Sequence, residues 1–187
     1  MKRGIKFLLI ADSLINLALG MIGPIYAIFV EKIGGDILDA SWAYFAYLAS
    51  SGFIMYLISK WEDHVKHKEK LVSFGYFLTS LGCLSYIFVF NQPSLLITQI
   101  ILGIATAFLN PAFDALYSHY TLKSEEASDW GSWEALGYIV TAIAALVGGY
   151  LATYLNFKFL FIVMFIASLI GAFVSLNLFR NKRYLNS

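Results

Sequence analysis

The chain has 187 residues, of which 59% are hydrophobic and 13% are charged; 13 Lys and Arg against 12 Asp and Glu give a net charge of +1. A soluble domain carries about a quarter charged residues, so this balance excludes a soluble globular protein and indicates a membrane protein. The single cysteine, Cys83, excludes an intrachain disulfide. Because it stands in an apolar run, we interpret it as a small core residue.

Six apolar segments are each long enough to cross a bilayer, which takes about 20 helical residues. They are continuously apolar rather than alternating, so helices are favoured over the strands of a barrel. The predicted fold class is therefore an all-α membrane protein with six transmembrane helices in a single domain over residues 1–187. The predicted spans are 7–30, 41–58, 71–90, 94–117, 130–154 and 157–179.

The first span could be confused with a secretory signal, because basic residues and an apolar run follow Met1. The run is longer than the usual signal core and contains Asp12 and Asn16. It also lacks a clear small-x-small cleavage site. We therefore expect it to be retained as the first helix.

The basic residues predict the orientation of the chain. Eleven of the 13 Lys and Arg residues fall on the side of the membrane that holds both termini, and the other two, Lys32 and Lys158, fall on the opposite side. Because basic loops stay in the cytoplasm, we expect cytoplasmic N- and C-termini and an integral, multi-pass cell-membrane protein.

The connection between the second and third spans carries a motif. Residues 59–68 read Ser-Lys-Trp-Glu-Asp-His-Val-Lys-His-Lys. This resembles the loop signature of the major facilitator superfamily, roughly Gly-x-Leu-Ala-Asp-Arg-x-Gly-Arg-Lys, with Asp63 and Lys68 kept. Both family arginines are replaced by His64 and His67, and both glycines are replaced as well.

The fourth and fifth spans strengthen the resemblance. Residues 103–116, with Asn110-Pro111-Ala112, resemble the family's fourth helix, and residues 135–151 resemble its fifth. Gln99 stands where the family's fourth helix has an arginine. Ala144-Ala145 replaces the Gly-Pro pair of the antiporters, which leaves proton-linked drug efflux without a motif of its own.

The resemblance implies one half of a twelve-helix fold, built as two inverted three-helix repeats. Gly20 and Pro24 in the first span then correspond loosely to Gly103 and Pro111 in the fourth, and we expect both prolines to break their helices. The resemblance also implies a homodimer that works by alternating access. Its first and fourth helices would line a central cavity, and its third and sixth would face lipid.

The family also suggests a role for the charged loop. Asp63, with Lys68, would latch the cytoplasmic side by placing the Asp63 carboxylate at a helix N-terminus of the opposite half, near 129–132 of a second copy. The alternative is a solvated loop whose lysines set topology and meet anionic lipid headgroups.

Three acids lie within predicted spans, where a charge costs about 2.5–3.5 kcal/mol on insertion scales. They are Asp12, Asp114 and Glu134, all in the cytoplasmic half. Acids at such positions usually face a cavity or a partner. The alternative for each is a shallow side chain that reaches the interface, although Asp and Glu reach less well than Lys or Arg.

Polar residues near these acids predict the lining of a cavity. Asn16 follows Asp12 by one helical turn, and the fourth span carries the stripe Gln99, Gly103, Thr106, Asn110 and Asp114. Burial and neighbouring like charge favour the protonated form of a carboxylate, so these acids are candidate proton carriers or binders of a cation. Apart from Lys158, at the very start of the last span, no Lys or Arg lies within a span, which argues against an anionic solute. Aromatic contacts for the solute could come from Tyr26, Tyr44, Tyr47, Trp42 and Phe113.

We find no catalytic, metal-binding or nucleotide-binding pattern, so we expect neither an enzyme nor a cofactor, and no nucleic-acid partner. The predicted function is a homodimeric secondary transporter, proton-coupled and drug-efflux-like, for a small cationic or neutral organic solute. The alternative is a non-transporting membrane module or one half of a heterodimeric transporter.

Overall fold

The computed structural model describes residues 3–122 and 124–180, and every regular element among them is helical. Six helical segments are long and apolar enough to cross a membrane, as predicted from the sequence. Five of the six spans begin or end a few residues beyond the apolar run that predicts them, because the helices continue through their polar ends, and the sixth, Phe157–Phe179, has the predicted bounds. The elements are α1 (Arg3–Gly20), η1 (Gly23–Ile25), α2 (Tyr26–Lys32), α3 (Ile37–Asp63), α4 (Lys68–Ser85), η2 (Tyr86–Phe88), α5 (Gln92–Tyr120), α6 (Glu126–Tyr154), α7 (Phe157–Ser175) and α8 (Asn177–Arg180).

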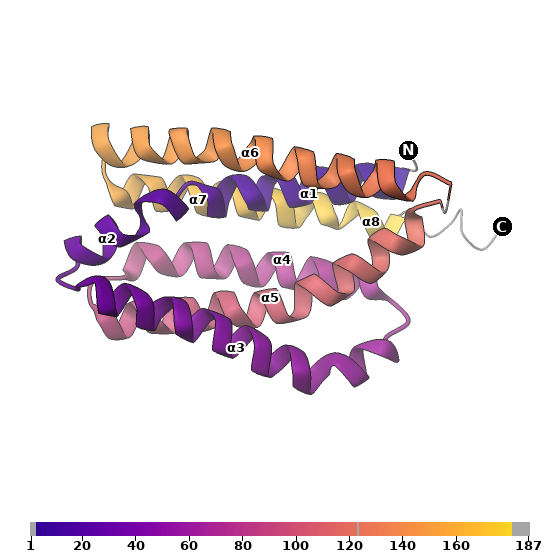
Figure 1. Ribbon diagram of the computed structural model, residues 1–187, viewed down its shortest axis with the longest axis horizontal. Coiled ribbons are helices and arrows are strands. Elements are labelled where there is room, and N and C mark those ends of the chain that lie inside the picture. Colours follow the sequence, from indigo (N-terminus) through magenta and orange to yellow (C-terminus); the bar gives the residue numbers. More distant parts are fainter. Residues whose placement is uncertain (1–2, 123, 181–187) are drawn as a thin grey trace.

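The helices alternate in direction, and both ends of the described chain lie at the same end of the bundle (Figure 1). We call this the inner end and the opposite one, at α2, the outer end. The three long helices that start at the outer end carry side-chain caps on their first N–H groups, from Asp36, Asn91 and Asn156. Of the basic residues that predict the orientation, Lys2, Lys123, Lys182 and Arg183 lie outside the described residues.

The long helices pack as two groups of three. In one group α1 packs on α6 and α7, and in the other α5 packs on α3 and α4. Contact between α4 and α7 joins the groups. If α1, α3 and α4 form one repeat and α5, α6 and α7 the other, the first helix of each repeat packs on the other two helices of the opposite repeat. Because α1 and α5 also run in opposite directions (Figure 1), this arrangement agrees with two inverted repeats.

Glycines at related positions of α1 and α5 let the helices within each group pack closely. A Cβ on Gly20 of α1 would come within 2.9 Å of the Ala144 Cβ on α6, and one on Gly103 of α5 would collide with the Tyr47 carbonyl and the Ser50 hydroxyl on α3. Small residues of this kind let helix backbones approach each other in a membrane. The two glycines therefore make the same kind of contact in the two repeats.

The two expected helix breaks differ. Helix α1 ends at Gly20, and Pro24 lies in the short 3-10 turn η1 before α2. Pro111 does not break α5, which runs without interruption from Gln92 to Tyr120, so the predicted break is wrong at this position. A proline removes one backbone hydrogen bond, and the helix-breaking residues of membrane helices are tolerated where neighbouring groups satisfy the freed backbone. Figure 1 shows α5 changing direction along its length rather than ending.

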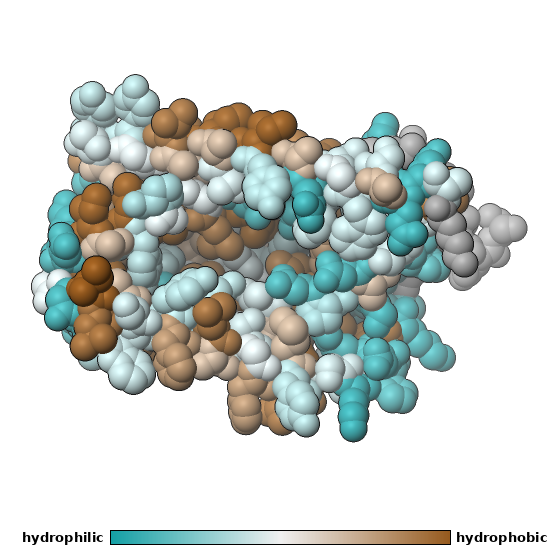
Figure 2. Space-filling model, in the orientation of Figure 1, coloured by the Kyte–Doolittle hydropathy of each residue, from teal (hydrophilic) through white to brown (hydrophobic). Residues whose placement is uncertain are grey.

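The helices differ in how much of their surface is covered. In the most apolar stretch of α3 and of α6, 11% of the residues are buried, against 56% in α4. Figure 2 shows this face of the molecule hollowed between the two groups, with hydrophilic residues gathered toward the inner end. Helices α3 and α6 are thus the flanks that the other described helices leave uncovered.

Candidate functional site

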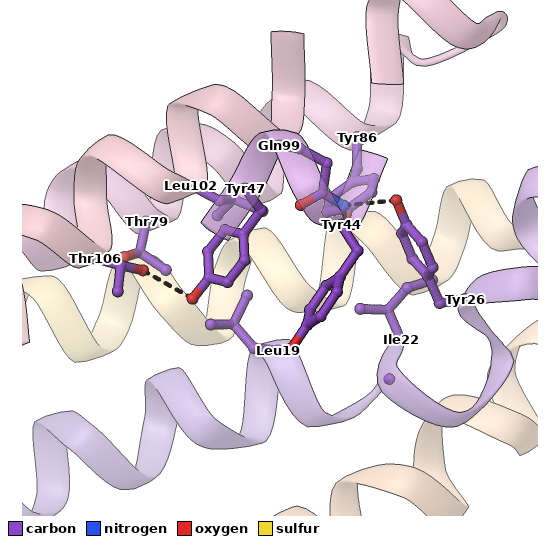
Figure 3. Close-up of a pocket in the computed structure, with 11 residues that line it drawn as sticks. Leu19, Ile22, Tyr26, Tyr44, Tyr47, Thr79, Tyr86, Gln99, Leu102 and Thr106 are labelled. Atoms are coloured by element: carbon purple, nitrogen blue, oxygen red, sulfur yellow. Dashed lines mark hydrogen bonds between the residues drawn. The ribbon is translucent and has the colours of Figure 1, made fainter. Parts of the chain in front are cut away.

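A cavity of about 300 Å³ lies toward the outer end, between the end of α1 and the group formed by α3, α4 and α5 (Figure 3). Four tyrosines line it, Tyr26, Tyr44, Tyr47 and Tyr86. The break after α1 brings Tyr26 to this cavity at the start of α2, and the 3-10 turn η2 brings Tyr86. We call this cavity the tyrosine pocket. The other described residues that line it are Leu19, Ile22, Gly23, Thr79, Gln99, Leu102 and Thr106, and none of the lining residues carries a formal charge at neutral pH.

Hydrogen bonds fix the polar groups of the tyrosine pocket. The buried side chain of Gln99 donates through Nε2 to the hydroxyl of Tyr26 at 2.8 Å and to the hydroxyl of Tyr86 at 3.0 Å. The Tyr47 hydroxyl pairs with Thr106 Oγ1 at 3.1 Å. Figure 3 shows the Gln99 oxygen directed away from Tyr26, toward the side on which Tyr47 lies.

A second polar cluster lies toward the inner end, around Asp12. Its Oδ2 accepts hydrogen bonds from Trp133 Nε1 at 2.8 Å and Asn16 Nδ2 at 2.9 Å, and its Oδ1 accepts from the Tyr76 hydroxyl at 3.3 Å. These donors come from α6, α1 and α4 respectively. The half-buried carboxylate therefore ties three helices together, and the carboxyl group of Asp114 lies within electrostatic range of it. We call Asp12 and its three donors the acid cluster.

Aromatic rings hold the inner ends of α5 and α6 together beside the acid cluster. Trp133 lies 5.4 Å from Phe113 and 5.4 Å from Trp130 between ring centroids. Tyr117 lies 4.8 Å from Trp130, and its hydroxyl donates to the Asp129 carbonyl at 2.6 Å. This packing fixes the indole that donates to Asp12.

The structure separates the polar stripe predicted on the fourth helix. Gln99 and Thr106 line the tyrosine pocket, whereas Gly103 packs on α3. Asn110 and Asp114 are exposed toward the inner end. Two chemically different regions therefore replace the single stripe.

The remaining predicted residues lie apart from both regions. Glu134 is exposed on α6, and Asp63 is exposed at the end of α3. Lys68 donates through Nζ to the backbone carbonyl of Glu62 at 2.9 Å, so within the described chain it closes its own loop. Of the predicted set, Asp12 and Asn16 are in direct contact, and Asp114 is near them.

Sequence reasoning missed Tyr76, Tyr86 and Trp133. Tyr76 and Tyr86 stand in a largely apolar segment, and the polar residues one turn from Tyr76, such as Ser73 and Ser80, give no sign of a link to Asp12 or Gln99. Trp133 stands beside Glu134, and its aromatic character marks it equally well as an interfacial anchor. No signal in a single sequence pairs these residues with partners on other helices.

The family model described as Major Facilitator Superfamily matches residues 8–186. The chain belongs to this superfamily. It is also similar to the quinolone resistance protein NorB of Staphylococcus aureus (strain bovine RF122 / ET3-1), with 28% identity over 171 residues. The aligned region covers 91% of this chain and 35% of that protein, so the chain spans about a third of the length of this relative. The resemblance seen in the loop and in the fourth and fifth helices is thus confirmed at the level of the family.

Membership in the superfamily gives the six helices a context. They form an integral membrane unit of a transporter family, arranged as in a six-helix member of that fold. The tyrosine pocket and the acid cluster are then polar regions within the membrane, and an ionisable side chain in such a position, here Asp12, is a functional-site hypothesis by default.

Proposed function

We propose that the chain is half of a secondary transporter and that two copies pair across α3 and α6 to move a small neutral or cationic organic solute by alternating access. Both termini would lie in the cytoplasm. The observation that carries the proposal is the exposed face of α6, where Glu134, Tyr138 and Thr141 follow one another at helical spacing. The Tyr138 side chain is 74% exposed near the middle of α6.

A comparison with α7 explains why this face needs a partner or a cavity. The exposed stripe of α7 consists of apolar side chains at steps of three and four, which suits lipid: Phe159, Ile162, Ile166, Ile170 and Phe173. Helix α6 exposes apolar side chains of the same kind at Ile139, Ile143 and Leu146, but a second exposed stripe, at Glu134, Tyr138 and Thr141, holds a carboxylate and hydroxyls. Because polar groups facing hydrocarbon are costly, we infer that this second stripe of α6 faces protein or a water-filled cavity.

A second copy is the partner that the repeats favour. Helices α3 and α6 hold equivalent positions in the two repeats, and both are largely uncovered. Twofold pairing would bring α3 of one copy against α6 of the other at two equivalent seams. In that arrangement, Asp63 would also approach the start of the other copy's α6, where N–H groups favour an anion.

Two observations support the solute class and the coupling. The relative is named for resistance to quinolones, which are planar aromatic drugs, and this supports an efflux-like role. Asp12 and Asp114 lie near each other in the inner half, and neither contacts a Lys or Arg among the described residues. Because neighbouring carboxyl groups disfavour double ionisation, they are the candidates to carry a proton.

The test is solute flux in liposomes that contain the purified chain. A quinolone and a panel of neutral and cationic organic solutes would be tried with and without an imposed pH gradient. We expect gradient-dependent accumulation of at least one solute, and a strong reduction when Asp12 is changed to Asn. Absence of flux for the whole panel would contradict transport by the chain acting with its own copies. Flux restored by a separately encoded six-helix chain would replace the homodimer with a heterodimer.

A further inference from the structure

We infer that the tyrosine pocket is a binding site, complete within one chain, for an uncharged, planar aromatic solute with an N–H donor. The inference rests on the proposed function, because it names the substrate class of that transporter. Its volume of about 300 Å³ is at the small end of ligand pockets, which suits a molecule of two or three fused rings.

The hydrogen-bonding state of Gln99 selects a donor on the solute. Both N–H groups of its amide are in use, on Tyr26 and Tyr86. Its Oε1 accepts no hydrogen bond from any described residue and is directed into the pocket (Figure 3). Oε1 is not among the described buried atoms that lack a partner, so it is open to the pocket. A solute that covers Oε1 without offering a donor leaves this carbonyl unpaired, which costs free energy, so an N–H group placed opposite Oε1 would be bound with preference over an apolar atom of the same shape.

The tyrosine rings select a flat apolar body. Tyr44 and Tyr47 lie with ring centroids 6.1 Å apart and an interplanar angle of 28°. Tyr47 is held by Thr106, whereas Tyr44 is 59% exposed and stands at the mouth. Such offset-stacked arrangements extend readily to another aromatic ring, so Tyr44 is the residue that would cover a bound solute.

The charge of the pocket excludes a cation as the preferred ligand. None of the described lining residues is an acid. Along the lining helices, the nearest acids are Asp39, five residues before Tyr44, and Glu31, five residues after Tyr26, and both lie toward the outer loop. At 1.5 Å per residue this is about 7–8 Å along the helix. A cation would therefore lose its hydration without a counter-charge, at a cost that tyrosine faces repay only partly.

The lining of the pocket also predicts how many solute molecules a dimer would bind. Its described lining comes from α1 to α5 of one chain, and α6, the proposed seam helix, contributes none of the lining residues. A dimer would therefore hold two equivalent sites off the twofold axis, instead of one central site shared between the copies.

The experiment measures equilibrium binding to the full chain in lipid nanodiscs, with empty nanodiscs subtracted. The probes are three tricyclic molecules of nearly the same shape: carbazole, which has the N–H donor; dibenzofuran, which has an oxygen in its place; and N-methylacridinium, which is cationic. Carbazole should bind one molecule per chain. Dibenzofuran should bind about tenfold more weakly, as expected for an acceptor left without its donor, and N-methylacridinium should bind more weakly still.

Variants locate the site. Tyr44→Ala should weaken carbazole binding several-fold, whereas Phe45→Ala, an aromatic residue of the same exposed fraction on the same helix but outside the pocket, should leave it unchanged. Gln99→Met should erase the difference between carbazole and dibenzofuran. If that variant fails to fold, the probe pair and the two α3 variants still test the inference.

Equal binding of all three probes, or equal effects of Tyr44→Ala and Phe45→Ala, would overturn the inference and would instead indicate a nonselective apolar groove filled by lipid chains. One carbazole for every two chains would also overturn it. Transport is scored separately by the liposome assay. Flux without selective carbazole binding would therefore contradict the proposed binding site and leave the proposed transporter standing. Selective binding without flux would contradict the transporter and leave the binding site standing.

Discussion

The tyrosine pocket and the acid cluster both join α1 and its neighbours, but they satisfy their polar atoms differently. In the acid cluster, both oxygens of Asp12 accept hydrogen bonds, from donors on three helices. In the tyrosine pocket, the amide nitrogen of Gln99 is saturated while its oxygen has no described partner. A saturated carboxylate holds the helices together, and it can take up a proton when they move and its donors leave. An unsaturated group beside a cavity is prepared for a ligand.

The largest effect is expected at the acid cluster. Asp12→Asn should abolish gradient-driven accumulation and leave slower downhill exchange, because an amide cannot carry a proton between the two sides. Asp12→Glu should keep part of the coupling. Flux in liposomes with and without a pH gradient is the measurement.

Folding has to be checked in parallel. Asp12→Ala leaves the Trp133 indole and the Asn16 amide without their acceptor, which should cost about 1–3 kcal/mol of stability. If Asp12→Asn responds to the gradient as the unchanged chain does, Asp12 is a structural tie and the proton carrier must be sought at Asp114 or Glu134.

The next largest effect is expected from a substitution at Gly103, which distinguishes the tyrosine pocket from the acid cluster. A valine there would collide with the Tyr47 backbone and push α3 away from α5. Overpacking of this kind costs about 1–3 kcal/mol. Thermal unfolding in nanodiscs should show the loss, and carbazole binding should fall because Tyr44 and Tyr47 move with α3.

Gly52→Val is the matched control, since a Cβ on Gly52 meets no atom within 4 Å. We expect it to change neither unfolding nor carbazole binding. Equal destabilisation by the two valines would mean that the close approach of α3 and α5 is not what shapes the pocket wall.

A smaller effect is expected from Tyr47→Phe, which removes the hydroxyl paired with Thr106. The loss of one partly buried hydrogen bond should cost about 0.5–1.5 kcal/mol and should loosen the ring that supports Tyr44. Carbazole binding should weaken by a few-fold while the pH-gradient response per bound solute stays the same. Tyr44→Phe, which loses a hydroxyl without a described partner, should be neutral in thermal unfolding; a loss as large as that of Tyr47→Phe would refute the role given to Thr106.

The smallest effect is expected at Asp63, outside both regions. Asp63→Asn should remove an anion–helix contact worth about 0.3–1 kcal/mol between copies and shift the chain away from the state closed at the inner end. Cysteine accessibility from the two sides of the membrane reports the shift. Glu31→Gln, an exposed acid at the outer end, is the control, and identical accessibility patterns for the two variants would eliminate the latch.

The sequence predicts the parts of this fold that depend on local chemistry. Apolar length predicts the six helices, and a one-turn spacing predicts the contact between Asp12 and Asn16. The prediction for Pro111 is wrong, because α5 continues through this residue. A proline breaks a helix less readily in a membrane, where neighbouring groups satisfy the backbone that the proline leaves free.

What the sequence could not predict depends on contacts between distant helices. Trp133 is 121 residues from Asp12, and Tyr26 is 73 residues from Gln99. The stripe on the fourth helix predicts one cavity, whereas the structure places Gln99 and Thr106 in the tyrosine pocket and leaves Asn110 and Asp114 exposed toward the inner end. Such separations arise from how two helices approach each other, which no spacing along one helix encodes.

The proposed transporter requires two six-helix units to pair, and the most direct test counts the chains in the smallest unit that transports. Chains labelled with one fluorophore each would be reconstituted sparsely into vesicles, and gradient-driven flux of the best solute from the liposome screen would be recorded vesicle by vesicle before photobleaching. We predict flux in vesicles that bleach in two steps and none in vesicles that bleach in one. Flux at the same rate in one-step vesicles would contradict the paired transporter.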